Sequence, residues 1–131
     1  MSKYLSFPDI VFKDRRLLLA ALVDLGYSQV EEGDALHLYG YQGDQRPETA
    51  QLVVRRSFVG SASNDLGFVQ TPEGYTPLLS EYDQRTLHSG QFVAKLRVAY
   101  SEQVVEEVRR RLHGSVRRSV DGGVVKITVR Y

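Results

Sequence analysis

The stretch DRRLLLAALVDLG, residues 14–26, decides the first element of the fold. Asp14 is of a residue type that caps helix N-termini, and Gly26 stands where a left-handed residue commonly ends a helix. Between them, apolar residues recur at helical spacing and widen into a broad stripe with few strongly polar interruptions. We therefore predict a helix from Asp14 to Leu25 that is either deeply packed or covered by a partner.

The residues that follow have the character of β-strands. Gln29–Glu32 and Ala35–Tyr41 flank the turn-forming pair Gly33-Asp34, and together they predict a hairpin. In its second strand the leucines share one face, and Tyr39 and Tyr41 share the other, because side chains alternate across a strand. Two tyrosines are therefore expected side by side on one face of the sheet.

The middle of the chain predicts further strands and a mobile connection. Gln51–Arg56 fits a strand, and Gly67–Gln70 with Tyr75–Leu79 fits a small hairpin around a Pro-Glu-Gly turn. Gly60–Asp65 has the composition of a mobile loop between them. Phe92–Tyr100 keeps both helical and strand periodicity, so periodicity leaves its state open.

The last third of the chain predicts a second helix and a second hairpin. Ser101–His113 carries an apolar stripe at helical spacing, and Gly114 is expected to end that helix. Val116–Val120 and Val124–Tyr131 flank Asp121-Gly122-Gly123, a strong hairpin signal. The chain is therefore expected to finish in a well-paired strand.

Asp14–Tyr41 and Ser101–Tyr131 share one plan of helix, glycine, strand, turn and strand. The shared plan indicates either that two helix-plus-hairpin units arose by internal duplication or that the same common motif is present twice without duplication. Both alternatives stay open. Either way, the order of elements predicts a single α+β domain over residues 1–131. Its sheet is expected to be mostly antiparallel, with helices packed on one face.

Composition narrows the function classes. Seventeen Lys and Arg against sixteen Asp and Glu give a net charge of +1, so no global field attracts nucleic acid or anionic membrane. The absence of cysteine excludes disulfides, a thiol nucleophile and thiolate zinc sites. No run approaches the ~20 apolar residues of a membrane span, and Met1–Phe12 does not resemble a signal peptide. A cytoplasmic location is therefore expected.

Five groups of short strings carry a family resemblance through their order and spacing. They are Met1-Ser2 with Ile10–Asp14, Asp24-Leu25-Gly26-Tyr27, Tyr39-Gly40-Tyr41-Gln42-Gly43, Asp65-Leu66-Gly67-Phe68 with Gly74-Tyr75, and Gly123–Tyr131. Together they resemble the Ycf35-like proteins of plastids, cyanobacteria and other bacteria, also called the domain of unknown function 1257. The resemblance runs nearly end to end. The chain departs from the family in lacking tryptophan and in the polar character of Ser80–Ser89.

This resemblance bears on the fold more than on the function. It implies that Phe92–Tyr100 is a helix that ends in its tyrosine. It implies no activity, because the family has no established catalytic residues to transfer. For a plastid-bearing host it implies the plastid stroma as the location.

The sequence shows none of the usual patterns of catalytic or metal-binding residues. Its histidines are not spaced with one another or with carboxylates as metal ligands are, and its serines lack a Gly-x-Ser-x-Gly setting. Glu106 and Glu107 lie four residues before arginines, which favours surface ion pairs over paired-carboxylate catalysis. No catalytic, cofactor-binding or metal-ligating residue is therefore assigned. An enzyme whose residues meet only in space is kept as an alternative.

The leading hypothesis is a non-enzymatic accessory or adaptor protein that binds another protein. Leu18 and Leu22 represent the apolar helix as a docking surface, and Tyr39 and Tyr41 represent the strand face. Tyrosines suit an interface because they bury a large area at a low cost in conformational entropy. The sequence does not name the partner, and a homo-oligomer of this chain is one of the assemblies it leaves open.

A nucleic acid is the rival ligand, because basic residues gather near the C-terminus. In the predicted hairpin Arg117, Lys126 and Arg130 share the face opposite the apolar row and form a basic stripe. Basic residues also occur at such places without any ligand. Arginines near a helix C-terminus complement the helix dipole, and charged residues on the outer face of a sheet keep it soluble. Arg118 falls on the inward face of its strand, where it is either a rim residue with its head in water or an anion site.

Overall fold

The computed structural model describes residues 2–119, with the side chains of 114–119 left aside. Its elements are β1 (Tyr4–Ser6), α1 (Arg15–Asp24), β2 (Glu31–Tyr39), β3 (Gln45–Val54), the 3-10 helix η1 (Arg56–Phe58), β4 (Leu66–Thr71), β5 (Gly74–Ser80), α2 (Glu81–Thr86), the 3-10 helix η2 (Leu87–Gly90) and α3 (Phe92–Ser119). Helices α1 and α3 bracket strands β2 to β5 in the sequence, and β1 precedes both.

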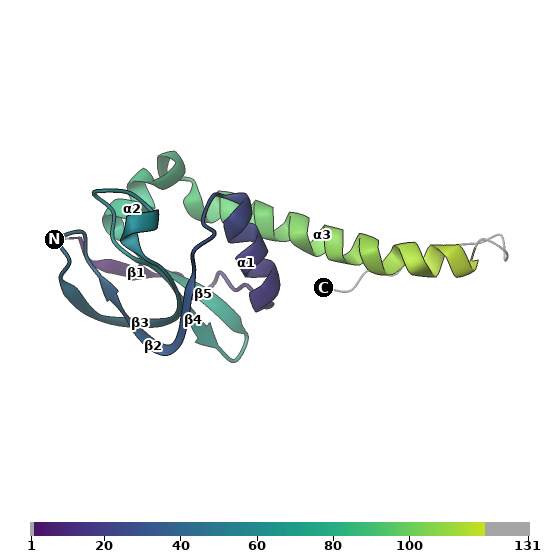
Figure 1. The fold of residues 1–131 in the computed structure, drawn as a ribbon, viewed down its shortest axis with the longest axis horizontal. Helices are drawn as coiled ribbons and strands as arrows, with labels where there is room; N and C mark the ends of the chain where they lie inside the picture. Colours follow the sequence, from purple (N-terminus) through teal and green to yellow (C-terminus); the bar gives the residue numbers. More distant parts are fainter. Residues whose placement is uncertain (1, 120–131) are drawn as a thin grey trace.

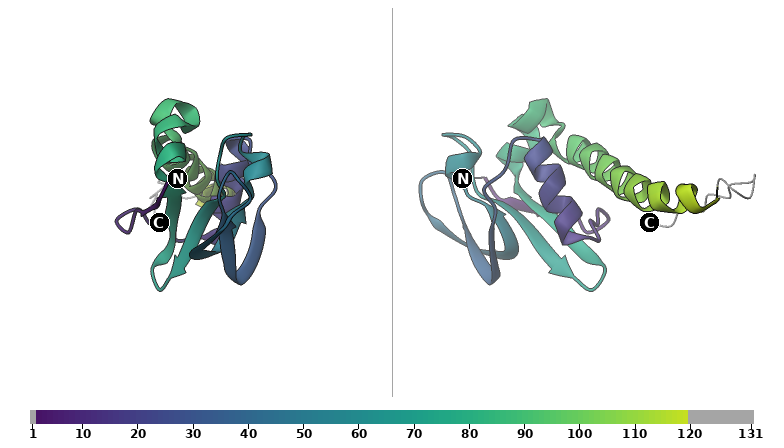
Figure 2. Two further views of the ribbon diagram at one scale, coloured as in Figure 1. Left: turned by 90° about the vertical axis from the view of Figure 1, so that its left-hand side faces the viewer. Right: turned by 45° about the vertical axis from the view of Figure 1, so that its right-hand side comes forward.

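The five strands form one antiparallel sheet in the order β1-β5-β4-β3-β2. Two hairpins, β2–β3 and β4–β5, make up most of it, and β1 adds to the free side of β5. Helices α1 and α3 lie side by side over one face of the sheet (Figure 1 and Figure 2). The predicted α+β class, with helices on one face of an antiparallel sheet, is confirmed.

The main hydrophobic core lies between these helices and the sheet. It contains residues from both helices, from strands β3, β4 and β5, and from the segment before α1: Phe12, Leu18, Ala21, Leu22, Tyr27, Leu52, Val54, Leu66, Phe68, Tyr75, Leu79, Phe92, Val93, Leu96 and Ala99. Three phenylalanines are its largest fully buried side chains, and Phe12 meets Phe68 edge to face at 6.4 Å between ring centroids. Burial of this apolar area is the main force holding α1 and α3 to the sheet.

A second, smaller cluster fills the concave side of the curved sheet. It consists of Leu38, Ala50, Val53 and Leu78. The curvature brings the turn end of the β2–β3 hairpin to the N-terminal segment, because Arg46 Nη1 donates a hydrogen bond to the Ser2 carbonyl at 2.9 Å. The same guanidinium lies 5.4 Å from the ring centroid of Tyr4 in β1. These contacts join β3 to β1 and the residues before it, although β4 and β5 separate the two strands in the sheet.

The first helix forms as its sequence predicts. Asp14 caps it by accepting a hydrogen bond from the Leu17 amide at 3.2 Å. Gly26 follows with φ of +98°, the left-handed conformation that favours glycine, and the Tyr27 amide then bonds to the Leu22 carbonyl at 2.8 Å. Local cap signals at both ends therefore set the bounds of α1.

The predicted hairpin around Gly33-Asp34 is wrong. Residues 31–39 form one strand, β2, whose register shifts between Glu32 and Leu36, and the chain reverses later, where Gly40 bonds to Asp44 at 2.8 Å. Its partner β3 accordingly begins at Gln45 rather than at Gln51. The hairpin predicted near residues 67–79 is confirmed as β4–β5.

The last described helix is longer than predicted. α3 runs without a break from Phe92 to Ser119, so Phe92–Tyr100 is helical as the resemblance implies, but the helix ends neither at Tyr100 nor at Gly114. Val116 to Ser119 are helical rather than part of a strand, and Val124–Tyr131 lies outside the described residues. The second helix-plus-hairpin unit therefore does not form over the described part of its length. Within residues 2–119, no helix has both the length and the apolar content to cross a bilayer.

Candidate partner-binding surfaces

The apolar helix is a core element and not a docking surface. Leu18 and Leu22 are both 0% exposed and belong to the main core under the sheet-facing side of α1. Assigning them to partner binding is wrong, because the sheet and α3 already occupy the face that they present. The helix does leave Val23 exposed on its outer side.

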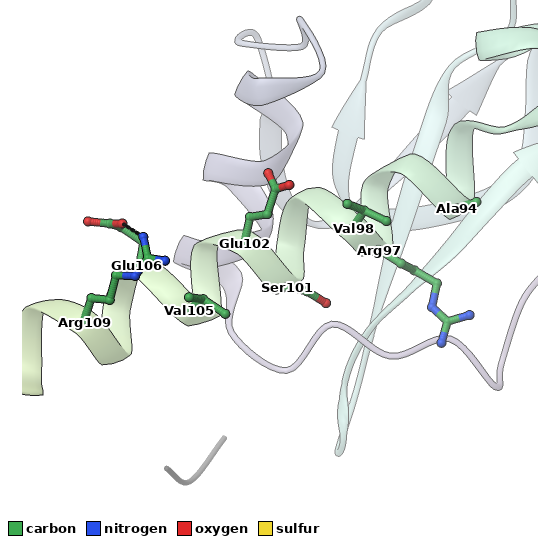
Figure 3. Close-up of a pocket in the computed structure, with 8 residues that line it drawn as sticks. All are labelled: Ala94, Arg97, Val98, Ser101, Glu102, Val105, Glu106 and Arg109. Carbon is green, nitrogen blue, oxygen red and sulfur yellow. Dashed lines mark ion pairs between the residues drawn. The ribbon is translucent and has the colours of Figure 1, made fainter. Parts of the chain in front are cut away.

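The outer side of α3, from Ala94 to Arg109, carries the first surface of interest. In Figure 1 the C-terminal half of α3 extends beyond α1 and the sheet, on the side of the molecule away from the N-terminus. Figure 3 shows one side of the helix, which we call the α3 face, lined by Ala94, Arg97, Val98, Ser101, Glu102, Val105, Glu106 and Arg109. Val98 is 59% exposed and Val105 is 40% exposed. The α3 face therefore leaves two valines open to solvent among charged side chains.

On its other side, α3 is fastened to α1. Arg16 pairs with Glu107 at 3.1 Å, and Gln103 bonds to Asp24 at 2.7 Å. The pKa of Glu107 is lowered, first by the hydrogen bond from Arg16. A hollow of about 830 Å³ lies between this part of α3 and residues 11–17. These contacts fix which side of α3 faces the domain.

Tyr39 and Tyr41 form the second surface, at the end of the edge strand β2. They are 36% and 41% exposed; Tyr39 follows the strand alternation, whereas Tyr41 lies past the end of β2, in the turn before β3. The Tyr39 hydroxyl donates to Gln45 at 3.0 Å, and the Arg55 guanidinium lies 5.6 Å from its ring centroid. The Tyr41 hydroxyl accepts a bond from Gln42 at 3.1 Å. We call these two rings the tyrosine surface.

The backbone beneath the tyrosine surface is held by the segment predicted to be mobile. The Tyr39 amide donates to Asp65 Oδ2 at 2.8 Å, the Asp65 amide donates back to the Tyr39 carbonyl at 3.0 Å, and the Tyr41 amide donates to Asn64 Oδ1 at 2.9 Å. Asn64 and Asp65 are almost fully buried. The prediction of a mobile Gly60–Asp65 loop is therefore wrong, since its last residues occupy the outer edge of β2.

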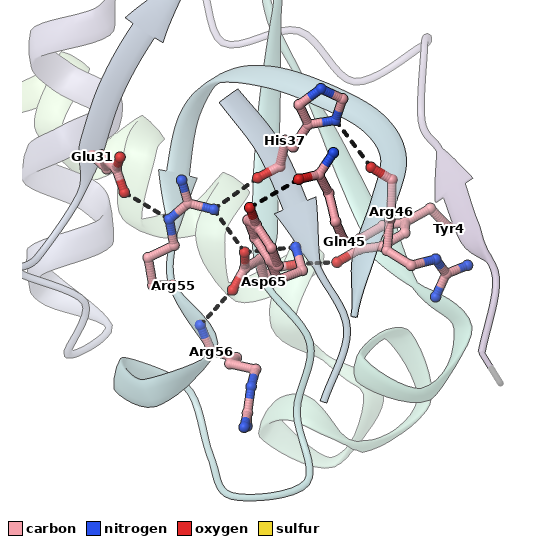
Figure 4. Close-up of polar contacts among 9 residues, drawn as sticks. Tyr4, Glu31, His37, Gln45, Arg46, Arg55, Arg56 and Asp65 are labelled. Carbon is pink, nitrogen blue, oxygen red and sulfur yellow. Dashed lines mark hydrogen bonds and ion pairs between the residues drawn. The ribbon is translucent and has the colours of Figure 1, made fainter. Parts of the chain in front are cut away.

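Asp65 is the centre of a larger polar network, shown in Figure 4. Its carboxylate accepts bonds from Arg55 Nη1 at 2.8 Å and from the Arg56 amide at 2.7 Å, in addition to the Tyr39 amide. Arg55 also donates to Glu31 at 2.6 Å and to a carbonyl of β2 at 2.8 Å. The hydrogen bond from Arg55 lowers the pKa of Glu31, and bonds to Glu31 and Asp65 raise the pKa of Arg55.

Two further contacts anchor this network in the domain. Burial, with the nearby Asp65 charge second, raises the pKa of Tyr4, whose hydroxyl donates to the Asp65 carbonyl at 2.8 Å. The backbone amide of Asn64 donates to Asp83 Oδ2 at 2.9 Å, and the same oxygen accepts a hydrogen bond from Ser80 Oγ at 2.8 Å. Ser80 in turn caps α2 through the Asp83 amide at 3.1 Å. The tyrosine surface is thus connected through buried hydrogen bonds to β1 and α2.

The predicted basic stripe and anion site are not formed as strand features. Arg117 and Arg118 belong to α3, so neither lies on a strand face, and Lys126 and Arg130 lie outside the described residues. Earlier along α3, Arg109 pairs with Glu106 at 3.8 Å, and Arg110 and Arg111 pair with Glu107 at 3.5 and 3.3 Å. Part of the positive charge of this helix is therefore balanced by its own glutamates.

A ring cluster surrounds His88 where α2 leads into α3. His88 Nε2 lies 3.0 Å from the Tyr27 hydroxyl, and its ring also packs near Phe92. His88 and Ser89 both have positive φ, 50° and 57°, an uncommon conformation for residues other than glycine. Burial, followed by the charge of Lys95, lowers the pKa of His88. Among residues 2–119 no group of three or more histidines or carboxylates is arranged to hold a metal ion.

Comparisons with known proteins place the chain in a family. The sequence model of the family described as "Protein of unknown function (DUF1257)" matches residues 21–119, which is more than half of the chain. No curated protein and no solved structure matches the chain in the corresponding comparisons. The match begins within α1 and covers the β2–β3 and β4–β5 hairpins, α2 and α3. The chain therefore belongs to the DUF1257 family of proteins of unknown function.

Proposed function

We propose that this protein is a non-enzymatic accessory or adaptor protein that binds another protein through the tyrosine surface. The observation that supports this most is the pairing of exposed rings with a fixed backbone. Tyr39 and Tyr41 are open to solvent, while the amide of each is bonded to a buried side chain, Asp65 for the first and Asn64 for the second.

Such an arrangement lowers the cost of binding. A surface whose backbone is already ordered loses little conformational entropy when a partner docks, and tyrosine side chains have only two main rotatable bonds to fix. The hydrogen bonds of Tyr39 to Gln45 and of Gln42 to Tyr41 further restrict the two rings. Aromatic side chains of this kind are enriched among the residues that dominate protein interfaces.

The same hydrogen bonds define the way in which a partner docks. The backbone at the end of β2 is bonded to Asn64 and Asp65, so a partner strand has no free amide to pair with at Tyr39 or Tyr41. Docking therefore uses the ring faces and hydroxyls, and the expected partner offers an apolar pocket with hydrogen-bond acceptors at its rim.

The test is recovery of a partner from an extract of the native host. The immobilised chain is compared with Tyr39→Ala/Tyr41→Ala and with the control Val23→Ala, a valine 54% exposed on α1. Two interface tyrosines worth about 2 kcal/mol each would lower the affinity by roughly three orders of magnitude when both are removed. We expect a protein recovered in equimolar amount by the wild type and the control but lost from the double variant. Equal recovery by all three forms would contradict the proposal.

Nucleic-acid binding stays the alternative function. Its test is titration with labelled single- and double-stranded oligonucleotides at low and high salt, comparing the wild type with Arg117→Ala/Lys126→Ala/Arg130→Ala. Affinity that falls steeply with salt and drops in the variant would favour this alternative. We expect no salt-dependent binding, because glutamates of α3 pair with Arg109, Arg110 and Arg111.

A further inference from the structure

A seam that begins on the α3 face and continues to Leu112 has the spacing of a helix that pairs with another helix. Small and apolar residues recur four, three, four, three and four residues apart: Ala94, Val98, Ser101, Val105, Val108 and Leu112. A repeat of this kind, three and four residues in alternation, produces a continuous seam along one side of a helix. In the main core α3 instead uses Phe92, Leu96 and Ala99, which lie on a different side. The part of the seam from Ala94 to Val105 is therefore not used in the packing of the main core.

The domain leaves the seam uncovered from Ala94 to Val105, whereas Val108 and Leu112 are half-buried and Val108 lines the hollow against residues 11–17. Val98 and Val105 are among the most exposed large apolar side chains of the described residues, and both lie on the α3 face in Figure 3. Ala94, which precedes Val98, and Ser101, which lies between the two valines, are exposed as well. The small residues at these places allow close approach of a second helix backbone.

The charges beside the seam are arranged in a gradient along α3. On the α3 face Glu102 and Glu106 precede Arg109, which pairs with Glu106 at 3.8 Å within the helix. Two copies of such a helix that run in opposite directions place the acidic part of each beside the basic part of the other. Antiparallel alignment also opposes the two helix dipoles favourably. The gradient therefore favours a second copy of the chain as the occupant of the seam.

We propose that two copies of this protein associate through their α3 faces as an antiparallel pair with two-fold symmetry. In the register that we infer, Val105 packs against Val108 of the second copy, and Ser101 packs against Leu112 of the second copy. This register brings Glu102 close to Arg109 of the second copy, and two-fold symmetry forms that ion pair twice.

The next antiparallel register, in which the two helices slide by one heptad toward each other's domains, is disfavoured by charge. It would bring Glu102 against Glu102 of the second copy and Arg97 against Arg111 of the second copy. Both contacts join like charges, which costs stability where they face each other. The same charges therefore select one antiparallel register over its neighbour.

The proposed contact is small, and its affinity is expected to be low. Val98 and Leu112 are separated by about 21 Å along the helix, which corresponds to about two heptads. An interface of this size falls in the weak, reversible class, so we expect a dissociation constant between about 10 and 100 µM. The proposal is independent of the tyrosine surface, which involves other elements.

Sedimentation equilibrium of the full chain from 5 to about 500 µM tests the association, over a range that brackets the expected constant. Val105→Glu is expected to weaken it at least ten-fold, whereas Val23→Glu, at a valine of similar exposure on α1, is expected to leave it unchanged. Arg109→Glu is expected to weaken it, and Glu102→Arg/Arg109→Glu is expected to restore it. A monomeric wild type at the highest concentration would overturn the proposal, as would equal effects of the two valine substitutions.

The absence of cysteine from the chain allows the direction of pairing to be tested by disulfide formation. We expect Ser101→Cys and Leu112→Cys to form a mixed dimer when combined and neither to cross-link alone. In the proposed register, two copies of Cys at residue 101 lie about 16 Å apart along the helix, beyond the reach of a disulfide. Rapid cross-linking of Ser101→Cys alone would indicate parallel pairing and overturn the antiparallel arrangement.

Discussion

Replacement of Asp65 by asparagine tests whether the buried polar network organises the tyrosine surface. Asp65 is 1% exposed and accepts three hydrogen bonds, from Arg55, from the Arg56 amide and from the Tyr39 amide. Asparagine has the same shape, but it lacks the negative charge and turns an NH₂ group toward one of these donors. The substitution therefore removes the ion pair and leaves one buried donor unsatisfied without creating a cavity.

The expected cost follows from the burial of this pair. Removing one partner of a buried ion pair costs about 3 to 5 kcal/mol. Arg55 keeps Glu31 as a partner and is 25% exposed, so we place the cost of Asp65→Asn at the lower end, about 3 kcal/mol. Glu31→Gln removes the other, half-exposed partner of the same guanidinium and should cost less than about 1 kcal/mol.

Urea unfolding measured by circular dichroism separates the two variants. The free energy of unfolding of a domain of this size falls by about 2 kcal/mol per molar urea. The urea midpoint of Asp65→Asn should therefore fall by roughly 1.5 M and that of Glu31→Gln by less than about 0.5 M. Amide hydrogen exchange at Tyr39 and Tyr41 should accelerate in Asp65→Asn well beyond its global loss of stability. Equal midpoints for the two variants, or unchanged protection at both tyrosines, would refute the assignment of Asp65 as the organising residue.

Two further predictions concern the backbone and the pH dependence of stability. Gly74→Ala should cost about 2 to 4 kcal/mol and Gly43→Ala about 1 to 2 kcal/mol in the same urea assay. Both glycines have positive φ, but an added Cβ at Gly74 would lie 2.6 Å from the Phe12 carbonyl oxygen, whereas at Gly43 it meets open space. Burial and the Lys95 charge hold the pKa of His88 below 6.5, so the unfolded chain binds more protons near pH 6 and stability falls as the solution is acidified. The urea midpoint should therefore drop more between pH 7.5 and 5.5 in the wild type than in His88→Asn, and parallel curves would contradict this role of His88.

The elements that were predicted correctly are those whose signals are local. In α1 the cap, the apolar stripe and the terminal glycine all lie within residues 14–26, so a short window contains every determinant of the helix. The hairpin β4–β5 is similar, because its turn and both strands are neighbours in the sequence. The exposure of Tyr39 also follows from a local rule, the alternation of side chains next to the buried Leu38, whereas the strand stops before Tyr41.

The errors arise where distant residues supply the deciding contacts. Gly60–Asp65 has a loop composition, but its polar groups are satisfied by Tyr39, Arg55 and Asp83, which no local pattern reveals. At Gly114 the local signal is ambiguous, because glycine inside a helix costs only about 1 kcal/mol relative to alanine and need not end it.

The candidate site was predicted unevenly for the same reason. An apolar helix side chain suits either a core or an interface, and only the position of the sheet decides for Leu18 and Leu22. The stripe of Val104, Val105, Val108 and Leu112 was predicted to be buried, but Val105 is 40% exposed and the others are half-buried, because α3 extends beyond the sheet that would cover them. The backbone anchors of the tyrosine surface, Asn64 and Asp65, were missed because they lie more than twenty residues from the strand end that they hold.

The two proposed surfaces lie toward opposite ends of the molecule, which makes their functions separable. Arg46 bonds to Ser2, so the β2–β3 turn beside Tyr41 lies near the N-terminus, and α3 extends away from that end in Figure 1. An antiparallel α3 pair would then carry one tyrosine surface at each outer end and could hold two partner molecules at once. Val105→Glu should leave binding of a partner in solution unchanged while weakening binding to a densely immobilised partner, since only the latter benefits from two linked sites. Conversely, Tyr39→Ala/Tyr41→Ala should abolish both kinds of binding and leave self-association intact, because substitutions at distant sites without shared contacts act independently.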